Sequence, residues 1–240
     1  MPGTGRRLAE RLGAPIDGAS LGCFRAAAGA ILLFEILDYA RHGWIARYWI
    51  DPAWHFPYWG FAWVAPWPGA WMYLHFAALA IFAVGLALGL FSRTCAALFC
   101  AGFTWIFLID QARYMNHLYL VCLLAGLLAV VPAGRAFSID ALRAGSARGP
   151  WVPAWSLLLL RAQVALVYVF GGLAKLSPDW LAGAPMRLVL SRAPALPEPL
   201  DVWLTSEWAA RFFTFGGLGF DLLVVPALLW RRTRPLAAVA

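Results

Sequence analysis

The chain alternates long apolar stretches with short polar or aromatic segments. Six apolar stretches have roughly the 20 residues that a helix needs to cross the hydrocarbon core of a bilayer. Since every backbone polar group must be satisfied inside lipid, the pattern predicts an all-α fold, a polytopic transmembrane helix bundle. In chain order we expect the spans at Leu21–Tyr39, Ala70–Phe91, Thr94–Asp110, His117–Val131, Val152–Ala174 and Glu207–Trp230.

The composition agrees with a membrane protein. The 240 residues are 62% hydrophobic and 13% charged, with a mean hydropathy of +0.71, which excludes an ordinary soluble domain. We expect a basic cytoplasmic leader at residues 1–20 and one transmembrane domain at residues 21–234. Residues 235–240 would begin a further, truncated span. The lipid bilayer is therefore the first expected partner, and the expected location is the cell membrane, as a multi-pass protein.

The formal net charge of +7 does not indicate nucleic acid, because the arginines are scattered between the spans and do not line one helix. A cytoplasmic N-terminus places more basic residues on the inner side than on the outer side, which is the usual bias. The four cysteines fall in apolar stretches and the four histidines show no ligand spacing, so we expect no metal.

Two links between the predicted spans are long. In Arg41–Gly69 a tryptophan recurs every four or five positions, which predicts an aromatic belt at the membrane interface. A lid over an amphiphilic substrate is the alternative. In Ser177–Ser206 prolines separate two apolar pieces, so one continuous helix is excluded and short helices on the outer surface are predicted.

Lys175 is the only lysine among the 19 lysine and arginine residues. An arginine stays protonated under ordinary conditions, whereas a desolvated lysine can lose its proton and act as a base. Lys175 is thus a candidate catalytic base. The alternative is a lysine that ends a membrane span and extends its amine to the headgroups.

The residues before Lys175 support a site at this end of the fifth span. In a helix, Arg161, Tyr168 and Lys175 recur every seven residues and lie near one face. Gly171 and Gly172 lie one turn before the lysine, where they leave room for a flat ligand or for the close approach of another helix. The sequence leaves both alternatives open.

Asn116 and His117 stand at the start of the fourth predicted span, after a polar turn on the outer side. The fifth span also ends on the outer side, so chain order allows this pair to meet Lys175. For His117 by itself, the alternative is a helix-end residue in the membrane interface.

Charged residues inside the spans need partners. At 1.5 Å per residue, Arg161 and Asp221 lie at similar depths, roughly 13 Å from the inner ends of their helices. Glu35 and Arg211 each lie about 6 Å from the outer surface by the same count. We therefore expect Arg161–Asp221 and Glu35–Arg211 as structural ion pairs.

The most specific features are MNHLYL at residues 115–120 and VPAWSLLLLRAQVALVYVFGGLAKLSPDW at residues 152–180. Through them the chain, from about Phe24 to Trp230, resembles the integral membrane part of the vitamin K-dependent gamma-carboxylases and their bacterial relatives, the horizontally transferred transmembrane domain group. A bacterial inner membrane is the location expected for such a relative.

The resemblance implies that Lys175 takes a proton from reduced vitamin K or a related quinol, with His117 in the same active site. Beside the lysine, we expect Asn116 and His117 to orient the quinol or to stabilise its anion. It implies that the quinol anion reacts with O2, giving an epoxide and a strong base. That base removes a γ-carbon proton from a peptide glutamate, which captures CO2. The expected function is thus an epoxidase with coupled carboxylation, a lyase activity. The residues expected to contact the membrane quinone are Tyr119, Tyr168, Gly171, Gly172 and Trp180.

The sequence departs from the family pattern in two respects. The family often has a second lysine at the position of Ala174, and it continues past this C-terminus with further spans that carry another histidine. The alternative function is therefore a non-catalytic membrane protein that binds a quinone or lipid on the same scaffold.

Overall fold

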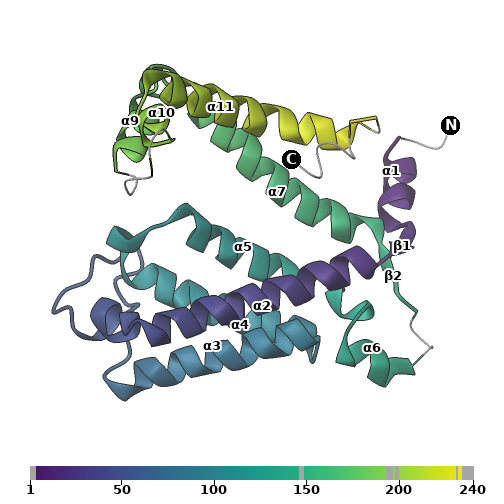
Figure 1. The fold of residues 1–240 in the computed structure, drawn as a ribbon. Helices are drawn as coiled ribbons and strands as arrows, with labels where there is room; N and C mark the ends of the chain where they lie inside the picture. Colours follow the sequence, from purple (N-terminus) through teal and green to yellow (C-terminus); the bar gives the residue numbers. More distant parts are fainter. Residues whose placement is uncertain (1–3, 146–148, 193–196, 198–199, 231, 234–240) are drawn as a thin grey trace. The chain divides into compact units, whose positions relative to one another are not determined.

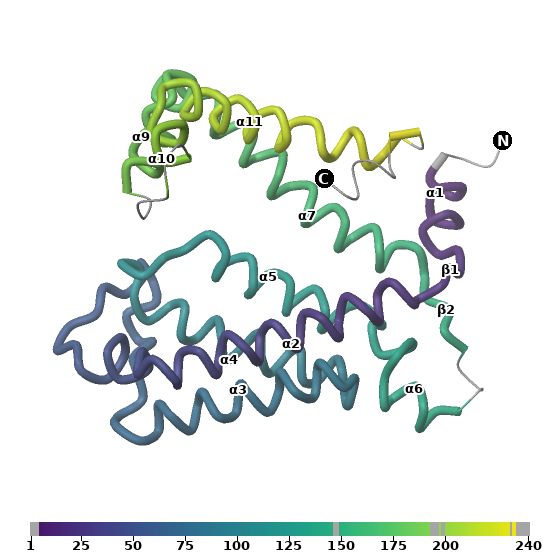
Figure 2. Tube along the Cα trace, viewed as in Figure 1, coloured from purple at the N-terminus to yellow at the C-terminus, as the bar shows by residue number. Residues whose placement is uncertain are grey.

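The computed structural model describes residues 4–145, 149–192, 197, 200–230 and 232–233. The chain divides into two compact units, which we call the N-terminal unit (residues 1–160) and the C-terminal unit (residues 161–240). Within each unit nearly all regular structure is helical (Figure 1), and the Cα trace in Figure 2 follows the same elements. The predicted all-α polytopic fold is confirmed.

All six predicted spans are helices. Five are long and apolar enough to cross a membrane: α2 (Ala19–Arg41), α3 (Ala70–Leu88), α4 (Ser92–Ile109), α7 (Ala154–Ala174) and α11 (Glu207–Leu229). The predicted fourth span is α5 (Asn116–Val130), an apolar helix of 15 residues. At 1.5 Å per residue α5 is about 22 Å long, which is shorter than a hydrocarbon core of about 30 Å. The predicted start of a seventh span lies outside the described residues.

The core of the N-terminal unit is a bundle in which α2 packs on α3, α3 on α4 and α4 on α5 (Figure 1). Residues three and four apart on a helix lie on one face, so buried positions at these spacings form a packing seam. In α3 such a seam consists of Met72, Phe76, Leu79, Ala83 and Leu86. The outward-facing residues of α2, among them Ile31 and Phe34, are exposed and suited to contact lipid.

Gly29 allows α2 to approach α3 closely. A Cβ atom at Gly29 would lie 2.3 Å from the backbone nitrogen of Ala87 and 2.9 Å from the carbonyl oxygen of Ala83. Since both neighbours are backbone atoms of α3, a larger residue would force the helices apart.

Arg25 is a fully buried residue of α2. Its guanidinium group donates hydrogen bonds to the carbonyl oxygens of Leu86, Ala87 at 2.8 Å and Phe137 at 2.6 Å. Leu86 and Ala87 both lie in the last turn of α3, where carbonyl groups lack i+4 partners within the helix, and Leu86 also accepts from the backbone N–H of Gly89. Arg25 therefore satisfies the end of α3 and fixes the loop that contains Phe137.

Short elements gather at the ends of the N-terminal bundle. Strands β1 (Pro15–Asp17) and β2 (Trp151–Pro153) pair antiparallel, with Ile16 opposite Val152. The remaining short elements of this unit are α1 (Thr4–Gly13), the π-helix η1 (Ala46–Ile50), the 3₁₀-helices η2 (Gln111–Arg113) and η3 (Ala133–Arg135), and α6 (Ile139–Ala144). The predicted leader thus contains a helix and a strand.

The tryptophans between α2 and α3 fall into two groups. Trp49 is buried in the core of the unit, whereas Trp54, Trp59 and Trp63 have exposed fractions of 74%, 96% and 67%. Exposed indole rings at the end of a helix bundle are typical of the membrane interface. This arrangement is the one expected for an aromatic belt.

The C-terminal unit contains most of α7, three short helices and α11. The short helices are α8 (Pro178–Leu181), α9 (Ala184–Ser191) and α10 (Leu200–Leu204), and all three pack on α11. They lie in the segment where prolines predicted short helices, so the short helices are confirmed for the described residues. Their place on the outer surface stays a prediction.

Candidate functional site

The candidate site is built around an ion pair within the C-terminal unit. Lys175 follows the last residue of α7, and its Nζ atom donates a hydrogen bond to Oδ2 of Asp221 on α11 at 2.6 Å. The exposed fractions of the two side chains are 23% and 15%. Because little water reaches this pair, its charges are screened less than those of a surface pair.

An aromatic ring lies on a second side of the lysine. The Nζ atom is 5.2 Å from the ring centroid of Trp180 in α8, which is within the range of a cation–π contact. The indole N–H of Trp180 donates to the carbonyl oxygen of Thr214 at 3.5 Å. Thr214 is itself buried, and its hydroxyl donates to the carbonyl oxygen of Ala210 at 2.7 Å. The lysine amine therefore lies between a carboxylate and an oriented ring.

Glycines bring α7 and α11 together beside the pair. A Cβ atom at Gly171 would lie 3.1 Å from Oδ2 of Asp221, and one at Gly172 would lie 2.6 Å from Cδ2 of Leu222. On α11, a Cβ atom at Gly217 would lie 3.7 Å from Nζ of Lys175. Of the two alternatives for Gly171 and Gly172, the structure shows the close approach of another helix. A quinol contact at these glycines stays a prediction.

Three residues of and just after α7 were predicted to share one face, and two of them, Tyr168 and Lys175, meet α11. The ring of Tyr168 packs edge-on against Phe220 with the centroids 5.8 Å apart, next to the residue that pairs with Lys175. Arg161 is exposed and forms no ion pair within the described part of the chain. Tyr168 and Lys175 therefore share the face that meets α11.

In the N-terminal unit, Asn116 and His117 are the first two residues of α5. Both are exposed, and neither side chain is hydrogen-bonded within the described residues. Their chain neighbours Met115 and Leu118, together with Arg113, line a small cavity of about 30 Å³. That cavity has room for about one water molecule.

Tyr119 is half exposed, and its ring lies 6.0 Å from that of Phe107. Nearby, the Tyr58 hydroxyl is buried without a hydrogen-bond partner in the described residues, and burial raises the pKa of this phenol above its ordinary value. Among the residues that the structure describes, no cluster of histidine, cysteine, aspartate and glutamate is suited to hold a metal ion.

The HTTM domain matches residues 14–240, which cover most of the N-terminal unit and all of the C-terminal unit. The chain belongs to the HTTM family. HTTM is the transmembrane domain of the vitamin K-dependent gamma-carboxylase-like family, so the resemblance seen in the sequence is confirmed. No solved structure matches the chain.

In this HTTM protein Asp221 pairs with Lys175. The predicted ion pair between Arg161 and Asp221 is therefore wrong. The depth count assumed that the inner ends of the two helices, the start of α7 and the end of α11, lie in one plane. In the structure, 14 residues of α11 precede Asp221, or about 21 Å of helix, and α8–α10 pack along this part. The middle of α11 therefore meets the end of α7.

Two other predictions join the two units. Arg211 lies 3.9 Å from Glu207 on its own helix, and Glu207 also accepts hydrogen bonds from Arg187 at 3.0 and 3.1 Å. The pairing of Arg211 with Glu35 stays a prediction. The same holds for a shared site of His117 and Lys175.

Sequence reasoning missed the part that Asp221 plays at the lysine. A usable signal was present. Asp221 is the only acidic residue of α11 apart from Glu207, and three glycines, Gly216, Gly217 and Gly219, shortly precede it. Small residues around a charge inside an apolar helix indicate a position where another helix supplies the partner.

Proposed function

We propose that this HTTM protein is an integral membrane enzyme that takes a proton from a quinol at the Lys175–Asp221 pair and oxygenates the quinol anion with O2. The observation that carries the proposal is the 2.6 Å contact between the two side chains, largely shielded from water on two apolar helices. The family supports the class of substrate, reduced vitamin K or a related quinol.

The observed pair defines how the proton would move. In the ion pair the Lys175 nitrogen is an ammonium, which has no lone pair to accept a proton. Transfer of one proton from Nζ to Oδ2 gives a neutral amine beside a carboxylic acid, and the amine then takes the proton of the quinol hydroxyl. The products are an ammonium, a protonated carboxyl and the quinol monoanion. Because the ammonium and the quinol anion form together, the net charge of the site does not change, which favours the step where the dielectric is low.

The oxygenation balances without a further oxidant. One oxygen atom of O2 becomes the epoxide oxygen, and the other leaves as water with the two hydrogens of the quinol. O2 gains the four electrons that the quinol loses. A role of Asn116 and His117 in orienting the quinol stays a prediction. Carboxylation of a peptide glutamate by CO2 would follow from the strong base that the oxygenation supplies.

The experiment compares Lys175→Arg with the wild type in lipid nanodiscs. Arginine keeps a positive charge for Asp221 but does not release its proton under ordinary conditions. We expect wild-type protein to consume O2 and form epoxide from one or more of a series of added naphthoquinols. The Lys175→Arg protein should retain its melting temperature and lose at least about 100-fold in rate, as expected when an acid–base group is removed. Normal turnover in this variant would contradict the proposal.

A second candidate is quinone binding without catalysis. The closed ion pair itself favours it, since a lysine bonded to Asp221 and packed on Trp180 also links α7 to α8 and α11 as a structural element. In that case an added quinone should quench tryptophan fluorescence, and quinol-dependent O2 uptake should equal that of Lys175→Ala.

A further inference from the structure

A cavity of about 1280 Å³ lies in the N-terminal unit where α2 begins, α4 begins and α5 ends. Three arginines line it: Arg93 at the start of α4, Arg135 in η3 after α5, and Arg143 in α6. Since the ends of membrane-spanning helices lie near the lipid headgroups, this cavity is at the depth where headgroup phosphates occur.

The carboxylates that line the cavity are already engaged with backbone N–H groups. Asp140 accepts hydrogen bonds from the backbone N–H groups of Phe91 and Ser92, both at 2.9 Å, and from the Ser92 hydroxyl at 2.9 Å. Asp17 accepts from the backbone N–H of Ala19 at 2.9 Å. Both carboxylates therefore accept hydrogen bonds at the starts of α4 and α2. The three arginines of the lining outnumber the two aspartates, so the lining has a net positive charge.

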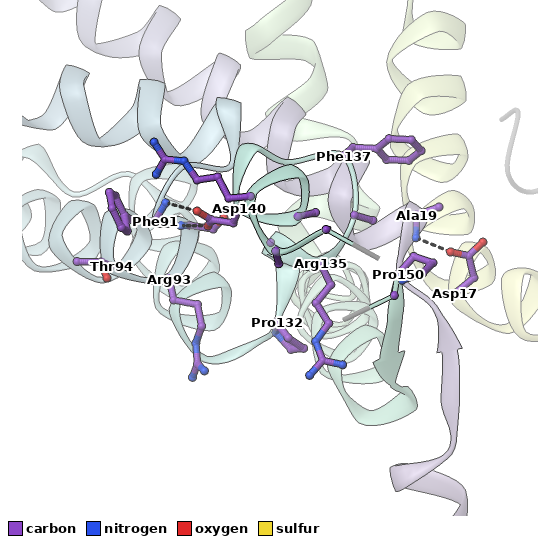
Figure 3. A pocket seen from close by; sticks show the side chains of 18 residues that line it. Asp17, Ala19, Phe91, Arg93, Thr94, Pro132, Arg135, Phe137, Asp140 and Pro150 are labelled. Carbon is purple, nitrogen blue, oxygen red and sulfur yellow. Dashed lines mark hydrogen bonds between the residues drawn. The ribbon is translucent and has the colours of Figure 1, made fainter. Parts of the chain in front are cut away.

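The arginines keep donors for a ligand. Among the described residues, Arg93 donates through Nε alone, to the carbonyl oxygen of Ala129 at 3.0 Å, and Arg135 donates through one terminal nitrogen to that of Trp151 at 2.7 Å. Figure 3 shows the side chains of Arg93 and Arg135 extending in the same direction, toward the bottom of the view. A guanidinium group has five N–H donors in a planar fork that matches the oxygens of a phosphate.

Two phenylalanines give the cavity an apolar rim. Phe91 and Phe137 have exposed fractions of 63% and 67%, and they are the non-glycine residues with positive φ in the described chain, at 47° and 48°. Bulky residues rarely adopt this conformation, so surrounding bonds must hold it. Asp140 binds the N–H of Phe91, and buried Arg25 binds the carbonyl oxygen of Phe137. The structure therefore holds two exposed aromatic rings at the cavity, and the Arg143 guanidinium carbon lies 5.8 Å from the centroid of the Phe91 ring.

We propose that this cavity binds the phosphate group of an anionic phospholipid, with Arg93 and Arg135 as the principal donors and with the acyl chains beside Phe91 and Phe137. The arginines supply charge and hydrogen bonds, and the exposed rings supply the apolar contact that a soluble phosphate does not need. Lipid bound there would join the ends of α2, α4 and α5, and so would stabilise the N-terminal unit.

Native mass spectrometry and thermal melting of the full chain, purified in a neutral detergent, test this site. The probes are phosphatidylglycerol, phosphatidylcholine and inorganic phosphate. We expect the wild type to retain phosphatidylglycerol in preference to phosphatidylcholine, and its melting temperature to rise only with the anionic lipid. Arg93→Gln with Arg135→Gln should weaken phosphatidylglycerol binding by tenfold or more, since each juxtamembrane arginine contributes several-fold in affinity.

The matched control is Arg7→Gln with Arg11→Gln, which removes the same charge from exposed positions of α1 outside the cavity. It should leave phosphatidylglycerol binding within about twofold of wild type. If the double variant Arg93→Gln with Arg135→Gln does not fold, the double variant Arg93→Lys with Arg135→Lys is measured in its place. It keeps the charge but loses the planar forks, so a weaker preference for phosphatidylglycerol is expected. Equal binding of the two lipids, an equal loss in the control, or full replacement of the lipid effect by inorganic phosphate would each overturn the proposal.

Discussion

The Nζ atom of Lys175 lies 2.6 Å from Oδ2 of Asp221, and the two residues come from helices whose glycines allow this approach. Both side chains are largely shielded from water, with exposed fractions of 23% and 15%. Removal of the lysine would leave a largely buried carboxylate without this partner, and removal of the carboxylate would leave an ammonium beside the Trp180 ring. The two residues should therefore depend on each other for stability as well as for chemistry.

A double-mutant cycle measures this dependence. We expect Lys175→Met and Asp221→Asn each to cost on the order of 1 to 3 kcal/mol, below the range for a fully buried pair because some water reaches both groups. The double variant should lose less than the two single losses combined, since it leaves no unpaired charge. Melting in detergent gives the three values. Additive losses would show that the pair contributes no coupling energy.

Substitution of Gly29 should separate α2 from α3. The added Cβ of Gly29→Ala would meet the backbone of α3 at 2.3 Å, so we expect a loss of about 1 to 3 kcal/mol in the free energy of unfolding. Gly216→Ala is the control, because a Cβ atom there has no neighbour within 4 Å and alanine favours a helix over glycine by about 0.5 to 1 kcal/mol. Equal melting temperatures for the two variants would contradict the close packing at Gly29.

Arg25→Met should destabilise the N-terminal unit. Methionine fits an apolar core, but it removes the donor to the carbonyl groups of Leu86, Ala87 and Phe137, of which only Leu86 also accepts a backbone N–H, that of Gly89, among the described residues. Each buried carbonyl that loses its partner costs about 1 to 3 kcal/mol. We therefore expect a loss on the order of 3 kcal/mol, measured by thermal melting. A variant as stable as the wild type would mean that these carbonyls find other partners.

The stability of the N-terminal unit should fall in acid through Asp140. Burial by itself would raise the pKa of Asp140, but hydrogen bonds from Ser92 and Phe91 and the charge of Arg143 outweigh it and hold the pKa below its ordinary value. The folded state therefore binds this proton less tightly than the unfolded state does. The stability that the carboxylate contributes is complete above its unfolded pKa, near about 4, and is lost as the pH falls through the lower folded pKa.

The check for Asp140 is the difference in melting temperature between the wild type and Asp140→Asn at a series of pH values. At pH 7 the wild type should be more stable, by roughly 1 to 2 kcal/mol, since the carboxylate caps the start of α4. This difference should shrink toward pH 3. A difference independent of pH would contradict the linkage.

The apolar stretches were enough to predict the helices, because a span of about 20 apolar residues has few alternatives in lipid. The partner of Asp221 required more. It depends on how far α11 extends past the end of α7, and residue counting does not contain that information. The cavity around Arg93, Arg135 and Arg143 was also missed, since its residues come from three separate links that the bundle brings together. Lys175 was found because its chemistry differs from that of every other basic residue in the chain.

The most direct measurement of the central claim is the absorption spectrum of a bound naphthoquinol without O2. The spectra of wild type and Lys175→Arg would be recorded at a pH where the free quinol is neutral, with binding of the quinol to both proteins checked by tryptophan quenching. If the Lys175–Asp221 pair accepts the quinol proton, the wild type should show the band of the quinol monoanion, and Lys175→Arg should show the neutral quinol. A monoanion band of equal size in both proteins would contradict the claim.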